Sequence, residues 1–306
     1  MEVEFLLSDP QDKLVESFVI NDEKNSPKAS SALNTLLVKI SKKETTLLSI
    51  VKDLHSFLTS TNQIHRSRGL LLLFNILDRC QDLAISSQEF VSLYEFFISK
   101  MTDIAATLEA LKCIYNLLVR NSSSHKKIFE DDKKLFDDFI GVLESKSFHT
   151  PAYAQEVRLT VYLILKHLTQ NCEKLCVDLD DKFLRIILDN VEEEQDPRNL
   201  MISFKLIHFV LDRLPSKTVG LFKTDIFEIL SMYYPITFKP PENDIFKISP
   251  EDLEGELNMC LCHTHLIPMT VEMVFDKVSA SQDSAKIACL NTLELLVQVR
   301  ESELSR

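Results

Sequence analysis

The feature that most restricts the fold is the spacing of the apolar residues, which recur at intervals of three and four positions along most of the chain. This spacing places side chains on one face of an α-helix, whereas a half-buried strand needs an alternation of period two. Leu47, Val51, Leu54 and Leu58 form one such stripe. The 306 residues include only 4 glycines, so residues that tolerate the positive φ angles of tight turns are scarce. Both observations predict helices rather than a sheet.

The helical stripes also repeat at a longer interval. They predict about a dozen helices in about six consecutive pairs, and the second helices are centred near residues 71, 111, 161, 205, 257 and 290. The repeat therefore averages about forty-four residues, inside the range of HEAT and armadillo units. Three second helices share a loose signature that begins with a basic residue: Arg68–Leu77, Arg158–Leu165 and Lys286–Leu296. Because one pair cannot cover its own apolar stripe, we predict an all-α, HEAT/armadillo-like α-solenoid; a compact helical bundle is the alternative.

Two stretches interrupt this pattern within what we expect to be a single solenoid domain over residues 1–306. Residues 21–31 are polar and contain Pro27, so we expect a loop or a frayed linker there, and residues 1–30 are expected to form a frayed N-terminal part. Residues 235–249 are expected to form a long loop between helices, and loops of this length are often functional. The spacing of Ser41 and Glu44 predicts a capping box before the helix that carries Leu47.

The charge and the cysteines restrict the partners and the compartment. The formal net charge is −12, which argues against direct binding to nucleic acid or to an anionic membrane surface. No apolar run reaches the roughly 20 residues needed to cross a bilayer, and the acidic start Met1–Glu4 does not resemble a secretory signal. The 7 cysteines are odd in number and scattered, so we expect reduced thiols in the cytosol or nucleus.

A search for catalytic or metal-binding groups finds one cluster, Cys260, Cys262, His263 and His265. These are competent zinc or iron–sulfur ligands, but neighbouring residues on a helix point in different directions and no second cluster completes a site. We therefore favour a fortuitous cluster and keep a metal-binding protein as an alternative. Phosphate loops and hydrolase or kinase motifs are absent, and paired carboxylates such as Asp131 and Asp132 resemble solvated helix ends. The sequence predicts no enzyme and no cofactor.

The turn Asp196-Pro197-Arg198-Asn199-Leu200 has a helix-start pattern. Aspartate can cap the following helix, proline fits its first position, and arginine can reach a carboxylate or carbonyl of a neighbouring unit. We favour such contacts between repeats over a partner-binding role for this turn.

Together with this turn, two later segments resemble a known family. They are Tyr233-Tyr-Pro-Ile-Thr-Phe-Lys-Pro-Pro-Glu-Asn-Asp244 and Ile248-Ser-Pro-Glu-Asp-Leu253. The combination resembles the N-terminal domain of the HEAT-repeat adaptor of the cytosolic iron–sulfur protein assembly targeting complex, the methyl-methanesulfonate-sensitivity, nucleotide excision repair and transcription family. The resemblance runs from about residue 65 to residue 298. Tyr234, Thr237 and Ile245 depart from the family pattern, which expects phenylalanine, an acid and proline there.

The resemblance implies a non-catalytic adaptor in the cytoplasm and nucleus. Such a protein would recruit iron–sulfur apoproteins of DNA replication, repair and genome maintenance, including helicases and polymerases, and would contact other subunits of the targeting complex. Clients would bind the concave face or the loop, and the candidate partner-binding residues are Arg198, Asn199, Tyr234, Phe238, Pro240, Pro241 and Asp244. Family members are several times longer, and their C-terminal region docks on the other subunits. The alternative is a generic HEAT-repeat scaffold in transport or in chromatin and transcription.

Overall fold

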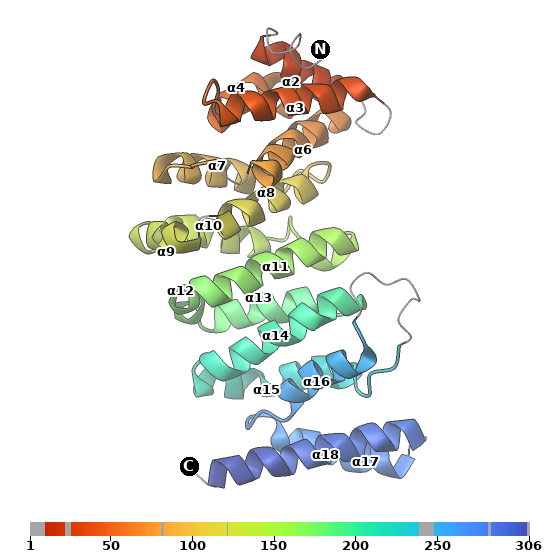
Figure 1. The fold of residues 1–306 in the computed structure, drawn as a ribbon. Helices are drawn as coiled ribbons and strands as arrows, with labels where there is room; N and C mark the ends of the chain where they lie inside the picture. The colour runs from red at the N-terminus through yellow and green to blue at the C-terminus, as the bar shows by residue number, and fades with distance from the viewer. Residues whose placement is uncertain are drawn as a thin grey trace. The chain divides into compact units, whose positions relative to one another are not determined.

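The computed structural model describes residues 10–21, 26–80, 83–120, 122–238, 248–280 and 283–304. These residues contain seventeen α-helices and one 3-10 helix, and no strand occurs among them (Figure 1). The predicted all-α, HEAT-like solenoid class is confirmed. The chain divides into two compact units, residues 1–149 and residues 150–306, and the expectation of a single domain stays a prediction. In the described part, no helix is long and apolar enough to cross a membrane.

Unit 1 is built from helices that pack on their neighbours in the chain. Its helices are α2 (Gln11–Ile20), α3 (Pro27–Ser41), α4 (Leu47–Asp53), α5 (His55–Leu58), α6 (Gln63–Arg79), α7 (Ser87–Lys100), α8 (Thr107–Arg120), α9 (Ser122–Asp131) and α10 (Lys133–Glu144). α2 packs on α3 and α6, α6 packs on α8, and α7 packs on α8 and α10. The phenylalanines at positions 90, 129 and 136 are fully buried and pack edge to face. The core of this unit is therefore continuous from one helix pair to the next.

Unit 2 repeats the same arrangement. Its elements are the 3-10 helix η1 (Thr150–Ala152), α11 (Gln155–Asn171), α12 (Glu173–Asp178), α13 (Asp181–Val191), α14 (Pro197–Arg213), α15 (Ser216–Met232), α16 (Pro250–Leu261), α17 (Ile267–Ala280) and α18 (Asp283–Leu304). The long helices α11, α14 and α16 pack one on the next, with α13 and α15 beside α14 (Figure 1). Apolar residues on the inner faces of these helices, such as Val161, Phe204 and Leu257, are fully buried.

Hydrogen bonds between neighbouring helices reveal the repeat length directly. In unit 1, the Arg120 guanidinium donates to the carbonyl of Leu77, 43 residues earlier. In unit 2, the Gln155 amide donates to Asn199, 44 residues later, and Lys277 donates to the carbonyl of Tyr234, 43 residues earlier. These separations confirm the period of about forty-four residues that the apolar stripes predict.

The structure has more helices than the dozen expected, because one predicted helix is divided and because α2, α3, α9 and α12 are not among the predicted stripes. The stripe from residue 47 to residue 58 is split into α4 and α5 at Leu54. The predicted capping box of Ser41 and Glu44 is wrong. Ser41 is the last residue of α3, and Thr46 caps α4 by accepting a hydrogen bond from the Ser49 backbone N–H. Ser41 and Glu44 lie at the C-terminal end of α3, so a serine and a glutamate three residues apart do not always mark the start of a helix.

The two predicted loops differ in outcome. Within residues 1–30, α2 is a regular helix that buries Leu14, Val15, Phe18 and Val19, so the expected frayed part is helical here. The prediction of a loop over residues 21–31 is wrong for residues 27–31, because Pro27 is the first residue of α3 and Ser26 caps it. The apolar stripe of α2 packs on α3 and α6, and this packing stabilises the helix although polar residues follow it in the sequence. In the stretch 235–249, residues 235–238 and 248–249 lie outside helices, and residues 239–247 lie outside the described part.

Candidate partner-binding surface

The turn before α14 is held by a buried carboxylate, that of Glu194. α13 ends at Val191, Glu193 adopts a left-handed φ of 61°, and Asp196 accepts a hydrogen bond from the Arg198 backbone N–H at 2.9 Å to start α14. The Glu194 side chain is 0% exposed. Its Oε1 accepts hydrogen bonds from the backbone N–H groups of Gln195 and Asp196, each at 3.0 Å. The turn therefore folds around an internal acceptor.

Side chains from two other helices complete the coordination of Glu194. Arg158 of α11 makes a bidentate ion pair with it, with both N–O distances at 2.8 Å. The Asn199 amide donates to its Oε2 at 2.8 Å, and the Tyr162 hydroxyl donates at 3.1 Å. Burial by itself would raise the pKa of the Glu194 carboxyl, but the Arg158 guanidinium, the backbone N–H of Asp196 and the Asn199 amide lower that pKa below its usual value. Glu194 is thus an ionised group inside the fold.

Unit 1 contains an equivalent ion pair between an arginine and an acid. Arg66 is the fourth residue of α6, as Arg158 is the fourth residue of α11. Arg66 makes a bidentate ion pair with Asp103, at 2.6 and 3.1 Å, and donates to the carbonyl of Ser60 at 2.9 Å. Arg158 likewise donates to the carbonyl of Tyr153 at 2.8 Å. Each arginine joins the connection before its own helix to an acid 36 or 37 residues later.

The loose sequence signature aligned Arg68 with Arg158, and the structure corrects that alignment. Arg66 occupies the position equivalent to Arg158, whereas Arg68 donates to the carbonyl of Phe18 at 2.6 Å. Sequence reasoning missed both ion pairs, although the recurring separation of arginine and acid was visible in the sequence. The sequence assigned the contact between repeats to Arg198, whereas the contacts beside this turn are made by Arg158 with Glu194 and by Gln155 with Asn199. Arg198 makes a bidentate pair with Asp196 in its own turn, at 2.9 and 2.7 Å.

The seven predicted site residues fall into three groups. Asn199 and Tyr234 are buried and bonded inside the chain: Asn199 accepts from Gln155 at 3.0 Å, and the Tyr234 hydroxyl lies 2.9 Å from the hydroxyl of Thr292. The Arg198 side chain is 33% exposed and Phe238 is half-buried, so both offer surface to a partner. Three further candidates, Pro240, Pro241 and Asp244, lie outside the described residues. A partner-binding role for the seven residues stays a prediction.

Tyr233 and Tyr234 fix the end of α15 to two different neighbours. The Tyr233 hydroxyl donates to the carbonyl of Val191 at 3.3 Å, and burial raises the pKa of Tyr233 to about 12. Tyr234 is followed by a cis peptide bond to Pro235, and its carbonyl accepts from Lys277 at 2.9 Å. The segment that leads to Phe238 therefore follows two tyrosines that are hydrogen-bonded to other parts of unit 2.

The cluster from Cys260 to His265 does not converge on one point. The Cys260 thiol donates to the carbonyl of Phe204 in α14 at 3.2 Å, whereas the Cys262 thiol faces the carbonyl of Thr292 in α18 at 4.0 Å. The His263 and His265 rings stack on each other, with centroids 5.5 Å apart. Burial raises the pKa of Cys262 to about 11 and lowers the pKa of His263. Within the described residues, no group of three or more histidine, cysteine or acidic side chains is arranged to hold a metal ion.

Comparison with known proteins places this fold in a family. Residues 51–304 match the MMS19 N-terminal family, which is described as a Dos2-interacting transcription regulator of RNA-Pol-II. The chain is 29% identical over 282 residues to the MMS19 nucleotide excision repair protein homolog of Dictyostelium discoideum, covering 92% of this chain and 24% of that protein.

Two further relatives come from other eukaryotes. The DNA repair/transcription protein mms19 of Schizosaccharomyces pombe is 25% identical over 281 residues, covering 91% of this chain and 26% of that protein. The human MMS19 nucleotide excision repair protein homolog is 29% identical over 257 residues, covering 81% of this chain and 23% of that protein. The chain thus spans about a quarter of the length of these relatives. With a match over residues 51–304, the chain belongs to the MMS19 N-terminal family.

Proposed function

We propose that this chain is the client-recruiting part of a non-catalytic adaptor in cytosolic iron–sulfur protein assembly. It would hold apoproteins of DNA replication, repair and genome maintenance, such as helicases and polymerases, while other subunits of the targeting complex insert the cluster. The family match over residues 51–304 is the observation that supports this most directly. The names of the relatives, which refer to nucleotide excision repair and transcription, agree with clients of this kind.

The chemistry of the described residues supports the scaffold role. The charged network of highest burial, around Glu194, is fully occupied by internal hydrogen bonds and stabilises the turn before α14. The thiols of Cys260 and Cys262 face carbonyl groups of two different helices, so these residues do not form a cluster site in the proposed adaptor. With a net charge of −12, it would contact clients rather than nucleic acid or membranes, in both the cytoplasm and the nucleus.

A binding experiment with purified proteins separates this proposal from its alternative. The immobilised chain is exposed to an iron–sulfur helicase without its cluster, to the same helicase with its cluster, and to a transcription factor that never binds one. We expect the strongest binding to the cluster-free helicase. The generic scaffold in transport or in chromatin and transcription is favoured by the family description, which names RNA-Pol-II, and it predicts no preference for the cluster-free form.

A matched pair of variants tests the proposed surface. Phe238→Ser removes the half-buried ring at the end of the 233–238 segment, and Leu221→Ser removes an equally apolar side chain that is 73% exposed on α15. If Phe238 contacts the client, its loss weakens binding about tenfold, because an apolar anchor at an interface contributes on the order of 1–2 kcal/mol. The Leu221 variant should bind normally. A fall in the melting temperature of the Phe238 variant would instead assign this residue to the packing of the chain.

A further inference from the structure

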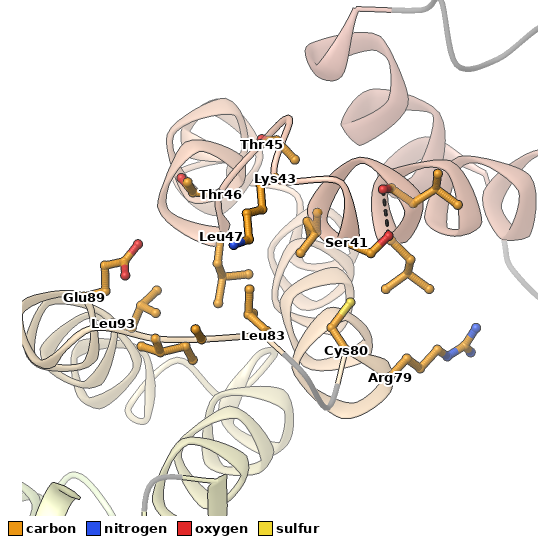
Figure 2. A pocket seen from close by; sticks show the side chains of 15 residues that line it. Ser41, Lys43, Thr45, Thr46, Leu47, Arg79, Cys80, Leu83, Glu89 and Leu93 are labelled. Carbon is orange, nitrogen blue, oxygen red and sulfur yellow. Dashed lines mark hydrogen bonds between the residues drawn. The ribbon is translucent and has the colours of Figure 1, made fainter.

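A cavity in unit 1 has no role in the proposed function. It measures about 770 Å³ and lies among the end of α3, the start of α4, the end of α6, residues 83–85 and the start of α7 (Figure 2). Apolar side chains line most of it, including Leu37, Val38, Ile40, Leu47, Leu83, Ile85 and Leu93. Such a volume is typical of pockets that bind ligands and has room for more than one side chain.

The mouth of the cavity is polar, and its charge is positive. Ser41, Lys43, Thr46 and Arg79 are the exposed polar residues of the lining, and we take them as the mouth. In Figure 2, Lys43 extends beside Leu47, whereas Arg79 points outward from the end of α6. Among the residues that the structure describes, neither cationic side chain has a hydrogen-bond or ion-pair partner. Two unpartnered cations beside an apolar surface are notable in a chain whose net charge is −12.

The acid at this site is already occupied. Glu89 is the acidic residue among the described residues that line the cavity. Its Oε2 accepts hydrogen bonds from the Ser86 backbone N–H at 3.0 Å and from the Ser86 hydroxyl at 2.8 Å, in the capping box of α7. Because Glu89 is held in this capping box and Arg79 points outward, Lys43 is the charge that a ligand in the cavity would meet, and it favours a negative group.

The backbone holds Lys43 at the mouth in an unfavourable conformation. Its φ is 60°, in the left-handed region that glycine normally occupies at the end of a helix. The Lys43 N–H donates to the carbonyl of Ile40 at 2.9 Å, and the Glu44 N–H donates to the carbonyl of Lys39 at 2.9 Å, which is the Schellman ending of α3. Side chains kept in such conformations occur preferentially where a site needs them. The end of α3 thus places the Lys43 ammonium group at the cavity, although glycine would adopt this backbone conformation at a lower cost.

We propose that this cavity binds a short peptide segment of a partner protein, with a leucine- or phenylalanine-sized side chain on the apolar floor and an adjacent aspartate or glutamate paired with Lys43. The apolar lining and the positive mouth are complementary to an acidic, apolar peptide. The proposal concerns unit 1 and stands whether or not the clients are iron–sulfur proteins.

Selection from random peptides tests the proposal without a known partner. Displayed short peptides are selected on the intact chain and counter-selected on a Lys43→Gly/Leu83→Ser double variant. We expect the retained peptides to share an acid next to a large apolar residue. Peptides without that pattern, or a selection that cannot distinguish the two proteins, would overturn the proposal, as would binding of fatty acid or of a second copy of the chain in place of peptide.

Single variants and a cysteine then locate the bound peptide. Lys43→Gly should weaken binding about tenfold, as expected for one partly desolvated charge-assisted contact, and Lys42→Gly removes the same charge from a neighbour outside the lining. Cys80 lines the cavity and is half-buried, while the other six cysteines are buried. A selected peptide should therefore slow alkylation of Cys80 in the unmodified chain. Unchanged alkylation at saturating peptide would place the binding site elsewhere.

Discussion

At the scale of single residues, the stability of the turn before α14 depends on one ionised carboxylate. Glu194 is fully buried, and its partners come from α11, from its own turn and from α14. Isolated charges of this kind are strongly unfavourable inside a protein, whereas a paired and fully hydrogen-bonded charge is tolerated. If α11 and the turn before α14 packed differently, Arg158 and Glu194 would be separated and left unpaired. The network therefore favours the observed packing of α11 against α14.

Removal of this charge tests that argument. Glu194→Gln keeps the shape of the side chain but leaves the Arg158 guanidinium, which is 19% exposed, without its counterion. We expect a loss of about 3 kcal/mol in the free energy of unfolding, measured by urea denaturation, because breaking one partner of a buried pair costs that much. Glu192→Gln on the exposed side of the same turn should change stability by less than about 0.5 kcal/mol. Equal effects of the two substitutions would contradict the role of the buried pair.

The same carboxylate makes stability depend on pH. The folded pKa of Glu194 lies below the value of about 4.3 for an unfolded chain, so its contribution is present above that value and is lost as pH falls through the folded pKa. The pKa values of Asp103 and Asp196 are lowered too, first by hydrogen bonds from Arg66 and Arg198. We expect the stability difference between the wild type and Glu194→Gln to be constant from pH 7 to about pH 5 and to shrink below about pH 4. A difference that grows on acidification would contradict this assignment.

Sequence reasoning identified the turn but not the pair that holds it. The aspartate cap and the proline of Asp196-Pro197 are local signals, and both are confirmed. The pairing of Arg158 with Glu194 spans 36 residues and depends on how one helix is offset against the next. Only the repetition of this separation, 37 residues between Arg66 and Asp103, would have exposed it in the sequence.

At the scale of helices, the end of α3 shows how one local signal can have two meanings. Ser41 and Glu44 have the spacing of a capping box, yet the helix ends there with Lys43 in the left-handed conformation. Start and end signals contain the same polar residues, and packing selects between them. A glycine at this position would have indicated the C-terminal end of the helix. Lysine is not such a signal, so neither the end of α3 nor the mouth of the cavity was predicted.

This helix end gives a prediction in which stability and binding move in opposite directions. Lys43→Gly relieves the steric cost of the left-handed conformation, so we expect the free energy of unfolding to rise by about 1 kcal/mol while peptide binding weakens. Lys42 has an ordinary right-handed conformation, with φ of −79°, and Lys42→Gly should be slightly destabilising because glycine is more flexible when unfolded. Thermal denaturation of both variants measures the effect. A destabilised Lys43→Gly chain would mean that its side chain supports the fold.

At the scale of the whole molecule, the fold class and the period were the most predictable properties. Both depend on the average positions of many apolar residues, so a few misplaced helix ends do not change them. The hydrogen bonds 43 and 44 residues apart have the same period because they join equivalent positions of neighbouring repeats. The cavity could not be predicted in this way, since it is lined by the ends of helices and by the residues between them, where the periodic signal stops.

Repeats that contact only their neighbours should also transmit damage only locally. Glu194→Gln disturbs α11, α13 and α14, which pack on one another within residues 150–306. We therefore expect amide hydrogen exchange to accelerate in these three helices, while α6 and α8 keep the protection that they have in the wild type. Exchange monitored by mass spectrometry under native conditions resolves the two sets of peptides. If α6 and α8 lost protection to the same extent, the 306 residues would unfold as one cooperative unit, which is the single domain that the sequence predicts.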